Sequence, residues 1–129
     1  MKVILANGTE LNSIMVMGSR KTIQGASRDT LTFIFPASES ITELDGHFTS
    51  QNCESIRLVG DDGQECIHHG YTIRDELSKK LVEVVPETEA DEAVYENRIF
   101  VSMAQRTYME SQLFATHEAV EMLCLPDAE

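Results

Sequence analysis

The sequence has no tryptophan, and only 6% of its 129 residues are aromatic. It contains no apolar run near 18 residues, so no transmembrane helix is predicted. The apolar start of the chain is interrupted early by the turn-forming pair Asn7-Gly8, which argues against a signal peptide. The three cysteines are an odd number, which argues against a disulfide framework and favours synthesis in a reducing, intracellular compartment.

Basic residues are also scarce, because ten Lys and Arg face 22 Asp and Glu, for a net charge of −12. Nucleic-acid phosphates and anionic membranes repel such a chain, so we expect neither as a partner. The charge is uneven: residues 1–36 hold four basic and two acidic groups, but residues 65–129 hold five basic and fourteen acidic groups. This asymmetry is compatible with ordinary surface variation or with head-to-tail complementarity between neighbouring subunits.

The acidic excess is densest in residues 83–96, which contain six carboxylates and no basic group. A solvated, self-repelling linker is the simplest interpretation of this stretch. The alternative is an acidic dock for a basic partner.

No catalytic motif is present, since the chain has neither a Gly-x-Ser-x-Gly elbow nor a Walker-type glycine loop. Cys66 and His68 could share one face of a strand as zinc ligands, but His69 would then point the other way. The run Asp61-Asp62-Gly63 before Glu65 is more typical of a solvated β-turn than of a calcium loop. We therefore predict no catalytic, cofactor-binding or metal-binding residue. A metal-dependent enzyme using Cys66 and His68 is the least favoured alternative.

The sequence predicts mainly β-strands from residue 2 to residue 85. Residues 2–6 and 10–17 are predicted to form a hairpin through a type I′ turn at Asn7-Gly8. Residues 29–36 alternate as a strand, which predicts that one face of it is buried. Residues 55–59 and 65–69 predict a second hairpin, and residues 77–85 a further strand.

A short helix is predicted between these strands. Ser40-Ile41-Thr42-Glu43 has the pattern of a capping box, and a stripe at helical spacing follows it. The expected core combines this stripe with the inward faces of the strands. Its predicted members are Leu31, Phe33, Phe35, Ile41, Leu44, Phe48, Ile56 and Leu58.

Residues 95–101 fit either one more strand or the lead-in to the last element. That last element is predicted to be helical, beginning at a second capping-box pattern, Ser102-Met103-Ala104-Gln105. Its apolar stripe has spacings of 4, 3, 4 and 3, which is a heptad seam. The stripe consists of Met109, Leu113, Thr116, Val120 and Leu123. A helix packed on its own core would show the same stripe. We predict that the stripe is a partner contact through which the chain self-associates.

These patterns together predict an α+β fold. A small antiparallel β-barrel or curled sheet with one packed short helix occupies residues 1–85. An acidic linker follows over residues 86–97, and a C-terminal helical segment over residues 98–129.

Three stretches also resemble a known group of proteins: Lys2 to Leu11, Gln24 to Phe33, and Val101 to Glu110. They are similar to small tail- or baseplate-associated proteins encoded by phages and prophages of Gram-positive bacteria. The order of a hairpin, a strand, a short helix, a hairpin with Asp61-Asp62-Gly63 and then Gly70-Tyr71 also looks like the hub-like β-barrel modules of tails. The resemblance implies a structural or assembly component without catalysis, present in the host cytoplasm during assembly and then in the virion tail. It implies as partners other tail proteins, the chain itself, or both. No functional residue is transferred with it.

A different class of function also fits the composition. The acidic stretch could make the chain a small regulatory binding protein that engages a basic partner. The two hypotheses differ in whether the carboxylates or the shape of the fold carry the activity.

Overall fold

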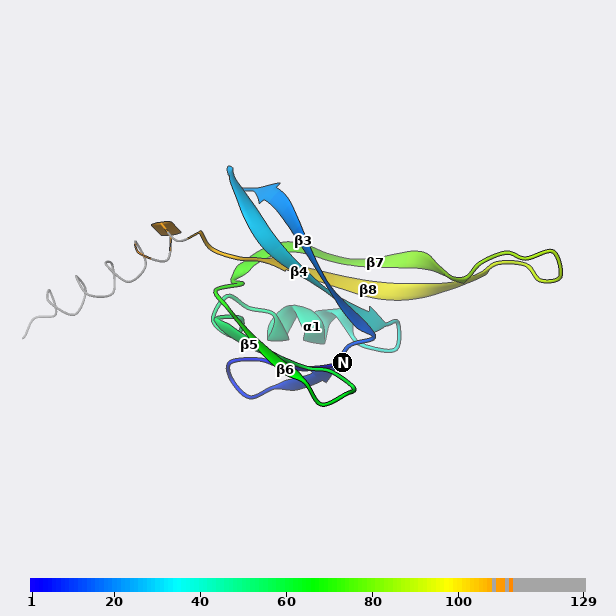
Figure 1. Cartoon of the computed structure of the whole chain (residues 1–129), viewed down its shortest axis with the longest axis horizontal. Coiled ribbons are helices and arrows are strands. Elements are labelled where there is room, and N and C mark those ends of the chain that lie inside the picture. Colours follow the sequence, from blue (N-terminus) through cyan, green and yellow to red (C-terminus); the bar gives the residue numbers. More distant parts are fainter. Residues whose placement is uncertain (108, 111, 113–129) are drawn as a thin grey trace, which may run out of the picture.

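The structure is a computed structural model that describes residues 1–107, 109, 110 and 112. Two four-stranded antiparallel sheets enclose one helix, α1 (Ile41–His47) (Figure 1). Sheet A has the strand order β2-β1-β5-β6, with bounds β1 (Lys2–Ile4), β2 (Glu10–Asn12), β5 (Ser55–Val59) and β6 (Glu65–His69). Sheet B has the order β3-β4-β8-β7, with bounds β3 (Met15–Ile23), β4 (Ala26–Pro36), β7 (Ile73–Val85) and β8 (Val94–Ala104).

The core lies between the two sheets and includes the inner side of α1. Phe33 and Phe35 of β4 contact Phe48, with ring centroids 5.0 and 5.9 Å apart. The predicted core residues are buried except Ile41, which is the first residue of the helix and is 38% exposed. Because three phenylalanines meet here, this contact joins the helix to sheet B.

The helix begins where the sequence predicts. The Ser40 hydroxyl accepts a hydrogen bond of 3.3 Å from the Glu43 backbone N–H, which satisfies one donor of the first turn. At the other end, Arg74 of β7 donates to the backbone carbonyls of Asp45 and Phe48. The helix is therefore fixed by a local cap at its start and by a distant strand at its end.

The predicted type I′ turn forms at a different pair of residues. Asn7 does not have a positive φ, and only Gly8 is left-handed in the loop between β1 and β2. Between β3 and β4, however, Gln24 and Gly25 have φ of 50° and 78°. A two-residue type I′ loop needs positive φ at both positions, so this hairpin has the turn that the sequence assigned to Asn7-Gly8.

Sheet B is strongly curled. The Lys21 ammonium on edge strand β3 lies 3.0 Å from the Asp75 carboxylate on the opposite edge strand, β7. Three strand spacings in a flat sheet would separate the edge backbones by about 14 Å, and side chains that stand perpendicular to a flat sheet would not meet across that distance. The prediction of an α+β fold with a curled antiparallel sheet and one packed helix is confirmed, and within the described residues neither sheet closes into a barrel.

The structure corrects the expectation for residues 94–104. Residues 94–97 were expected in the linker and 98–104 in the helical segment, but all of them form β8, which pairs with β4 and β7. The capping-box pattern at Ser102 does not begin a helix, because Ser102 lies within β8 and its Oγ is hydrogen-bonded to Thr32 Oγ1 at 2.8 Å. Ser102 pairs with Thr32 of β4, which lies 70 residues away in the sequence. A local capping pattern carries no information about such a distant pairing.

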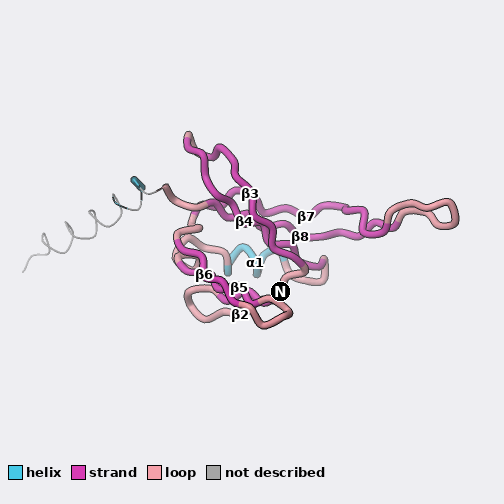
Figure 2. Tube along the Cα trace, viewed as in Figure 1, coloured by secondary structure: helices cyan, strands magenta, loops and turns pink. Residues whose placement is uncertain are grey.

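The acidic stretch accordingly joins two paired strands. Residues 86–93 connect β7 to β8, so the expected boundary after residue 85 falls inside a hairpin. Figure 2 shows this hairpin extending well beyond the rest of the molecule. Of the expected C-terminal helix, residues 109, 110 and 112 are helical, and residues 113–129 lie outside the described residues.

Candidate functional site

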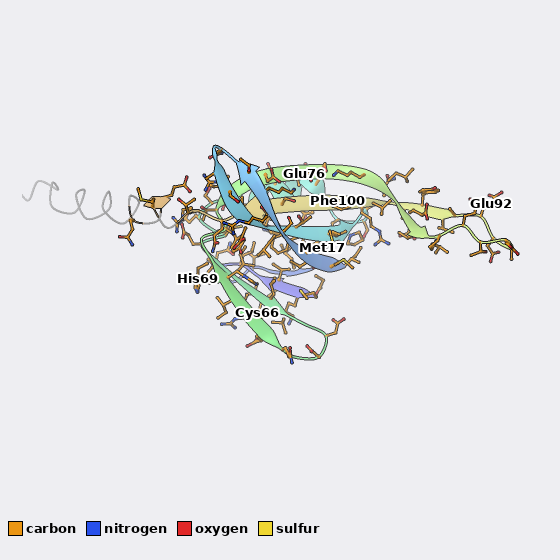
Figure 3. The ribbon with its side chains drawn as sticks, turned by 45° about the horizontal axis from the view of Figure 1, so that its top comes forward. Met17, Cys66, His69, Glu76, Glu92 and Phe100 are labelled. Carbon is orange, nitrogen blue, oxygen red and sulfur yellow. The ribbon has the colours of Figure 1, made fainter. Side chains whose placement is uncertain are left out.

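The most distinctive surface is the outer part of the β7–β8 hairpin, residues 81–97, which we call the arm. All six of its carboxylates are exposed, and it contains no basic residue. They are Glu83, Glu87, Glu89, Asp91, Glu92 and Glu96. Figure 3 shows Glu92 at the far end of the arm, away from Cys66 and His69 on β6.

The arm also exposes apolar side chains that continue the core-facing side of the sheet. Leu81 and Tyr95 share the sheet face of Ile99, because side chains two residues apart point the same way. Ile99 is 1% exposed, but Leu81 is 66% and Tyr95 53% exposed. This face of sheet B therefore continues beyond the part that sheet A and α1 cover.

Hydrogen bonds fix the geometry of the arm. Tyr95 donates its hydroxyl to Glu83 Oε2 across the strands at 3.2 Å, and this bond raises the pKa of Tyr95. At the tip, the Thr88 backbone N–H donates to the Asp91 carbonyl at 2.8 Å, and the Asp91 N–H donates to Thr88 Oγ1 at 3.0 Å. The carboxylates are thus presented on a structured turn.

Positive charge gathers at the base of the arm. Lys80 and Arg98 face each other on β7 and β8. The Lys80 ammonium lies 2.6 Å from the Glu76 carboxylate and 5.0 Å from the centre of the Phe100 ring. Hydrogen bonding from Lys80, and then from Ser78, lowers the pKa of Glu76. Arg98 Nη2 in turn lies 2.8 Å from the Glu96 carboxylate, so both basic residues at the boundary between body and arm are ion-paired.

A second candidate surface is a polar hollow of about 250 Å³, formed where the β3–β4 hairpin meets the chain after β8. We call it the arginine hollow, and its lining holds three arginines and one carboxylate. The lining residues are Arg20, Ser27, Arg28, Asp29, Gln105, Arg106 and Thr107. Another hollow, of about 420 Å³, has no charged lining residue and is formed by Ala6, Asn7, Gln51 and Asn52.

Two of the arginines in the hollow are held differently. Arg20 has a side chain that is 65% exposed, and it donates from Nε to Ser27 Oγ at 2.8 Å and from Nη1 to Asp29 Oδ1 at 3.0 Å. Its Nη2 has no hydrogen-bond partner among the residues that the structure describes. Arg28 is 2% exposed and donates to the carbonyls of Ile23 and Gln105. Of these two arginines, Arg20 is therefore the exposed one and Arg28 the buried one.

Arg28 also binds Glu110, and this ion pair fixes the start of the C-terminal segment. The guanidinium donates from Nη1 to Glu110 Oε1 and from Nη2 to Oε2, the latter at 2.8 Å. The pKa of Glu110 is lowered to about 2, first by these bonds and then by the Thr107 backbone N–H. The pair also raises the pKa of Arg28.

A capping box does occur shortly after β8, but it begins at Thr107 and not at the predicted Ser102. The Thr107 N–H donates to Glu110 Oε1 at 2.8 Å, and the Glu110 N–H donates to Thr107 Oγ1 at 3.2 Å. This reciprocal pattern is that of a helix N-terminus. It lies five residues after the pattern at Ser102 that the sequence analysis selected.

Of the predicted contact stripe, only Met109 lies within the described residues. It is 71% exposed, so its side chain is not packed on the core. Leu113, Thr116, Val120 and Leu123 lie outside the described residues, and their role as a partner contact stays a prediction.

The cysteines and histidines do not come together as a metal site in the described part of the chain, where no group of three or more His, Cys, Asp or Glu could hold an ion. Cys53 is buried, and desolvation raises the pKa of its thiol to about 12. Cys66 is exposed on β6, and the His68 ring meets the Tyr71 ring edge-on with centroids 5.6 Å apart. A protonated, buried thiol is a poor nucleophile.

Comparison with protein families, with curated proteins and with solved structures finds no match. In the part of the chain that the structure describes, no helix has both the length and the apolar character needed to cross a membrane.

The sequence reasoning identified part of these surfaces. It singled out the acidic stretch, but as a linker or an acidic dock rather than as the end of a paired hairpin. The excess of basic groups in residues 1–36 includes Arg20 and Arg28, but nothing in the sequence placed Arg106 beside them. Arg106 lies 78 residues after Arg28, and only the pairing of β4 with β8 unites the two.

Proposed function

We propose that this protein is a non-enzymatic structural or assembly component of a phage or prophage tail or baseplate. It acts through protein–protein contacts, with other tail proteins, other copies of itself, or both as partners. It is present in the host cytoplasm during assembly and then in the virion tail.

The observation that carries the proposal is the arm. A two-stranded hairpin with uncovered apolar side chains and six carboxylates contributes little to the core, so a role outside the body explains it best. Leu81 and Tyr95 offer apolar contact area, and the surrounding carboxylates favour partners with basic rims.

The resemblance to tail-associated proteins adds to this. Two of the three stretches that carry it, residues 24–33 and 101–110, lie side by side through the pairing of β4 with β8. The Gln105 N–H also donates to the Asp29 carbonyl at 2.9 Å. These stretches therefore shape one connected region of sheet B, as expected of segments that define a fold rather than a catalytic centre.

The test is genetic and structural. The gene is deleted in its host, particles are produced, and they are inspected by electron microscopy and by mass spectrometry of the purified tails. We expect tailless or defective particles without the protein, and restoration by the wild-type chain. Intact, infective particles in the deletion strain would contradict the proposal.

An arm-shortened variant sharpens this test. It joins Val82 to Glu96 through Asn-Gly and so keeps the body of the hairpin. We expect it to fold but not to restore assembly. As the matched control, Glu39, Glu43 and Glu65 are changed to Gln and Asp61 to Asn; these four carboxylates are exposed and lie outside the arm, and this variant should restore assembly.

The alternative, a small acidic regulatory protein that engages a basic partner, is favoured by the absence of any basic residue from the arm. It predicts tight binding to a purified basic host protein and loss of that binding when Glu87, Glu89, Asp91 and Glu92 are replaced by Ser. The same replacements would then leave particle assembly unchanged, which separates this function from the first.

A further inference from the structure

The outer strand of sheet A, β6, has one backbone edge uncovered. Within the described residues β6 pairs only with β5, because it ends the strand order β2-β1-β5-β6. Edge strands attract further strands, and proteins usually protect them with lysine, proline, a bulge or a very short length. The edge strands of sheet B carry basic residues, and β2 has only 3 residues. β6 has 5 residues, with no lysine, arginine, proline or register shift.

The ladder with β5 shows which backbone groups of β6 face outward. Before the strand, the Gly60 N–H donates to the Gln64 carbonyl at 2.8 Å. After it, the Gly70 N–H donates to the Glu54 carbonyl at 3.0 Å. Because bonded and non-bonded pairs alternate along an antiparallel ladder, every second residue from Gln64 to Gly70 bonds to β5. The residues between them direct their N–H and C=O groups away from β5, and they are Glu65, Ile67 and His69.

Most of these outward groups have no partner in the part of the chain that the structure describes. Gln105 Nε2 donates to the His69 carbonyl at 3.0 Å, and a carbonyl oxygen has a second lone pair. The outward N–H groups, and the carbonyls of Glu65 and Ile67, make no hydrogen bond to another described residue. The edge therefore presents alternating donors and acceptors to a further strand.

The side chains of the same residues make this edge complementary to itself. They share the outer face of sheet A, with Ile67 in the middle and 52% exposed. Glu65 and His69 are exposed on either side of it, and neither has an ion-pair partner among the described residues. In an antiparallel pairing about a two-fold axis at Ile67, Glu65 of each copy lies opposite His69 of the other. A carboxylate opposite an imidazole and an apolar pair at the centre both stabilise paired strands.

We propose that two copies of this chain pair antiparallel through β6, so that their A sheets join into one continuous sheet. The register places Ile67 against Ile67 of the second copy and Glu65 against His69 of the second copy. A two-fold contact of this kind uses the same surface on both copies and closes at the dimer. The inference rests on the proposed function only in that other copies of the chain are among its partners.

The β6 contact leaves the arms uncovered. Figure 3 shows Glu92, at the far end of the arm, well away from Cys66 and His69 on β6. Each dimer therefore presents two arms, and two linked arms bind a repeating partner more tightly than one. The arm and β6 can consequently be tested separately.

The first test removes a single backbone donor from β6. Ile67→Pro deletes an N–H that faces away from β5, and edge strands tolerate proline at such positions. The matched control is Asn12→Pro on β2, the other edge of sheet A, where the same alternation directs the N–H outward. Ile67→Thr keeps the N–H and changes only the side chain.

The second test exchanges charges to examine the register. His69→Glu places two carboxylates opposite each other at both ends of the contact, which weakens pairing. Glu65→His combined with His69→Glu restores each pair with its members exchanged, so association should return. The four-carboxylate control defined above contains Glu65→Gln, which keeps an oxygen acceptor for His69, and it should associate like the wild type.

All variants are compared by sedimentation velocity of the full chain over a range of concentrations, with a reductant present because Cys66 is exposed. We expect dimers from the wild type, from Asn12→Pro and from the arm-shortened variant. Ile67→Pro and His69→Glu should each associate about tenfold more weakly or worse, and Ile67→Thr should lose less than Ile67→Pro. Circular dichroism shows whether each variant is folded, and if Ile67→Pro is not, the charge exchange decides.

Several outcomes would overturn the inference. The wild type could stay monomeric at every concentration, Ile67→Pro could dimerise like the wild type, or Asn12→Pro could lose as much as Ile67→Pro. Equal losses in Ile67→Thr and Ile67→Pro would exclude backbone pairing, and no recovery in the exchanged variant would exclude the register. Loss of the dimer on shortening the arm would assign the contact to the arm. A negative result here with defective particles in the deletion strain removes only the β6 contact and leaves the proposed function standing.

Discussion

The two halves of the β7–β8 hairpin differ sharply although their strands pair along the whole length. Near the body, Ile99, Val101 and Met103 are at most 1% exposed. In the arm, Leu81 and Tyr95 lie on the same face as Ile99 and are mostly exposed. Pairing with a neighbouring strand is present in both halves, but only the first half is covered by sheet A and α1.

This contrast separates two roles of a strand. Backbone pairing organises the hairpin, but burial of apolar area provides most of the stabilisation, about 25 cal/mol per Å². The arm is therefore expected to contribute little to folding and to be available for contacts. β8 also has two unlike ends, because its first residues belong to the arm and the chain after its last residue is held by the Arg28–Glu110 pair.

The largest expected effect tests the covered half. Ile99→Ala should lower the free energy of unfolding by about 2–5 kcal/mol, because it leaves a cavity at a fully buried site. Urea denaturation monitored by circular dichroism measures it. Leu81→Ala, on the same face of the arm, is the control and should change stability by no more than about 0.5 kcal/mol. Equal losses for the two variants would mean that the arm is covered.

A smaller effect is expected after the C-terminal end of β8, where Arg28 binds Glu110. Glu110→Gln should lower the free energy of unfolding by about 1 kcal/mol at neutral pH, because it weakens charge-assisted hydrogen bonds to a side chain that is still 38% exposed. The pKa of Glu110 is lowered to about 2 in the folded state, from about 4.3 unfolded. Its contribution is therefore present above pH 4.3 and is lost as the pH falls toward 2.

The measurement compares the wild type with Glu110→Gln by denaturation at several pH values. The difference between them should be largest at neutral pH and nearly absent at about pH 2. Glu43→Gln, at an exposed position of α1, should show no such convergence. A difference that stays constant with pH would exclude the ion pair as its source.

The smallest effect is expected from removing the arm itself. Joining Val82 to Glu96 through Asn-Gly deletes most of the arm's exposed apolar and acidic side chains but no buried residue. The free energy of unfolding should change by less than about 1 kcal/mol, since shortening a surface hairpin costs little. Loss of cooperative unfolding in this variant would indicate that the arm supports the core.

Several elements were predictable from local patterns. The strand over residues 29–36 alternates clearly, and the Ser40 cap sets the start of α1, so both were found. The hairpin of residues 55–69 was found because dense turn formers separate two alternating runs. In each case the signal lies within about ten residues of the element that it specifies.

The misses have a common physical cause. Ile99, Val101 and Met103 alternate as a strand should, but a capping-box pattern at Ser102 competed with that signal. The choice between them depends on a partner strand, β4, that lies far away in sequence. The arginine hollow was missed for the same reason, because Arg106 reaches Arg20 only through that pairing.

The sequence by itself determined the charge of the arm, the alternation of the core strands and the cap of the helix, since each depends on residue type and short spacing. Only the tertiary structure decided that the acidic stretch is the end of a paired hairpin and that three arginines share one hollow. Strand pairing and burial are long-range, and which neighbour covers a strand is fixed only when the whole chain has folded.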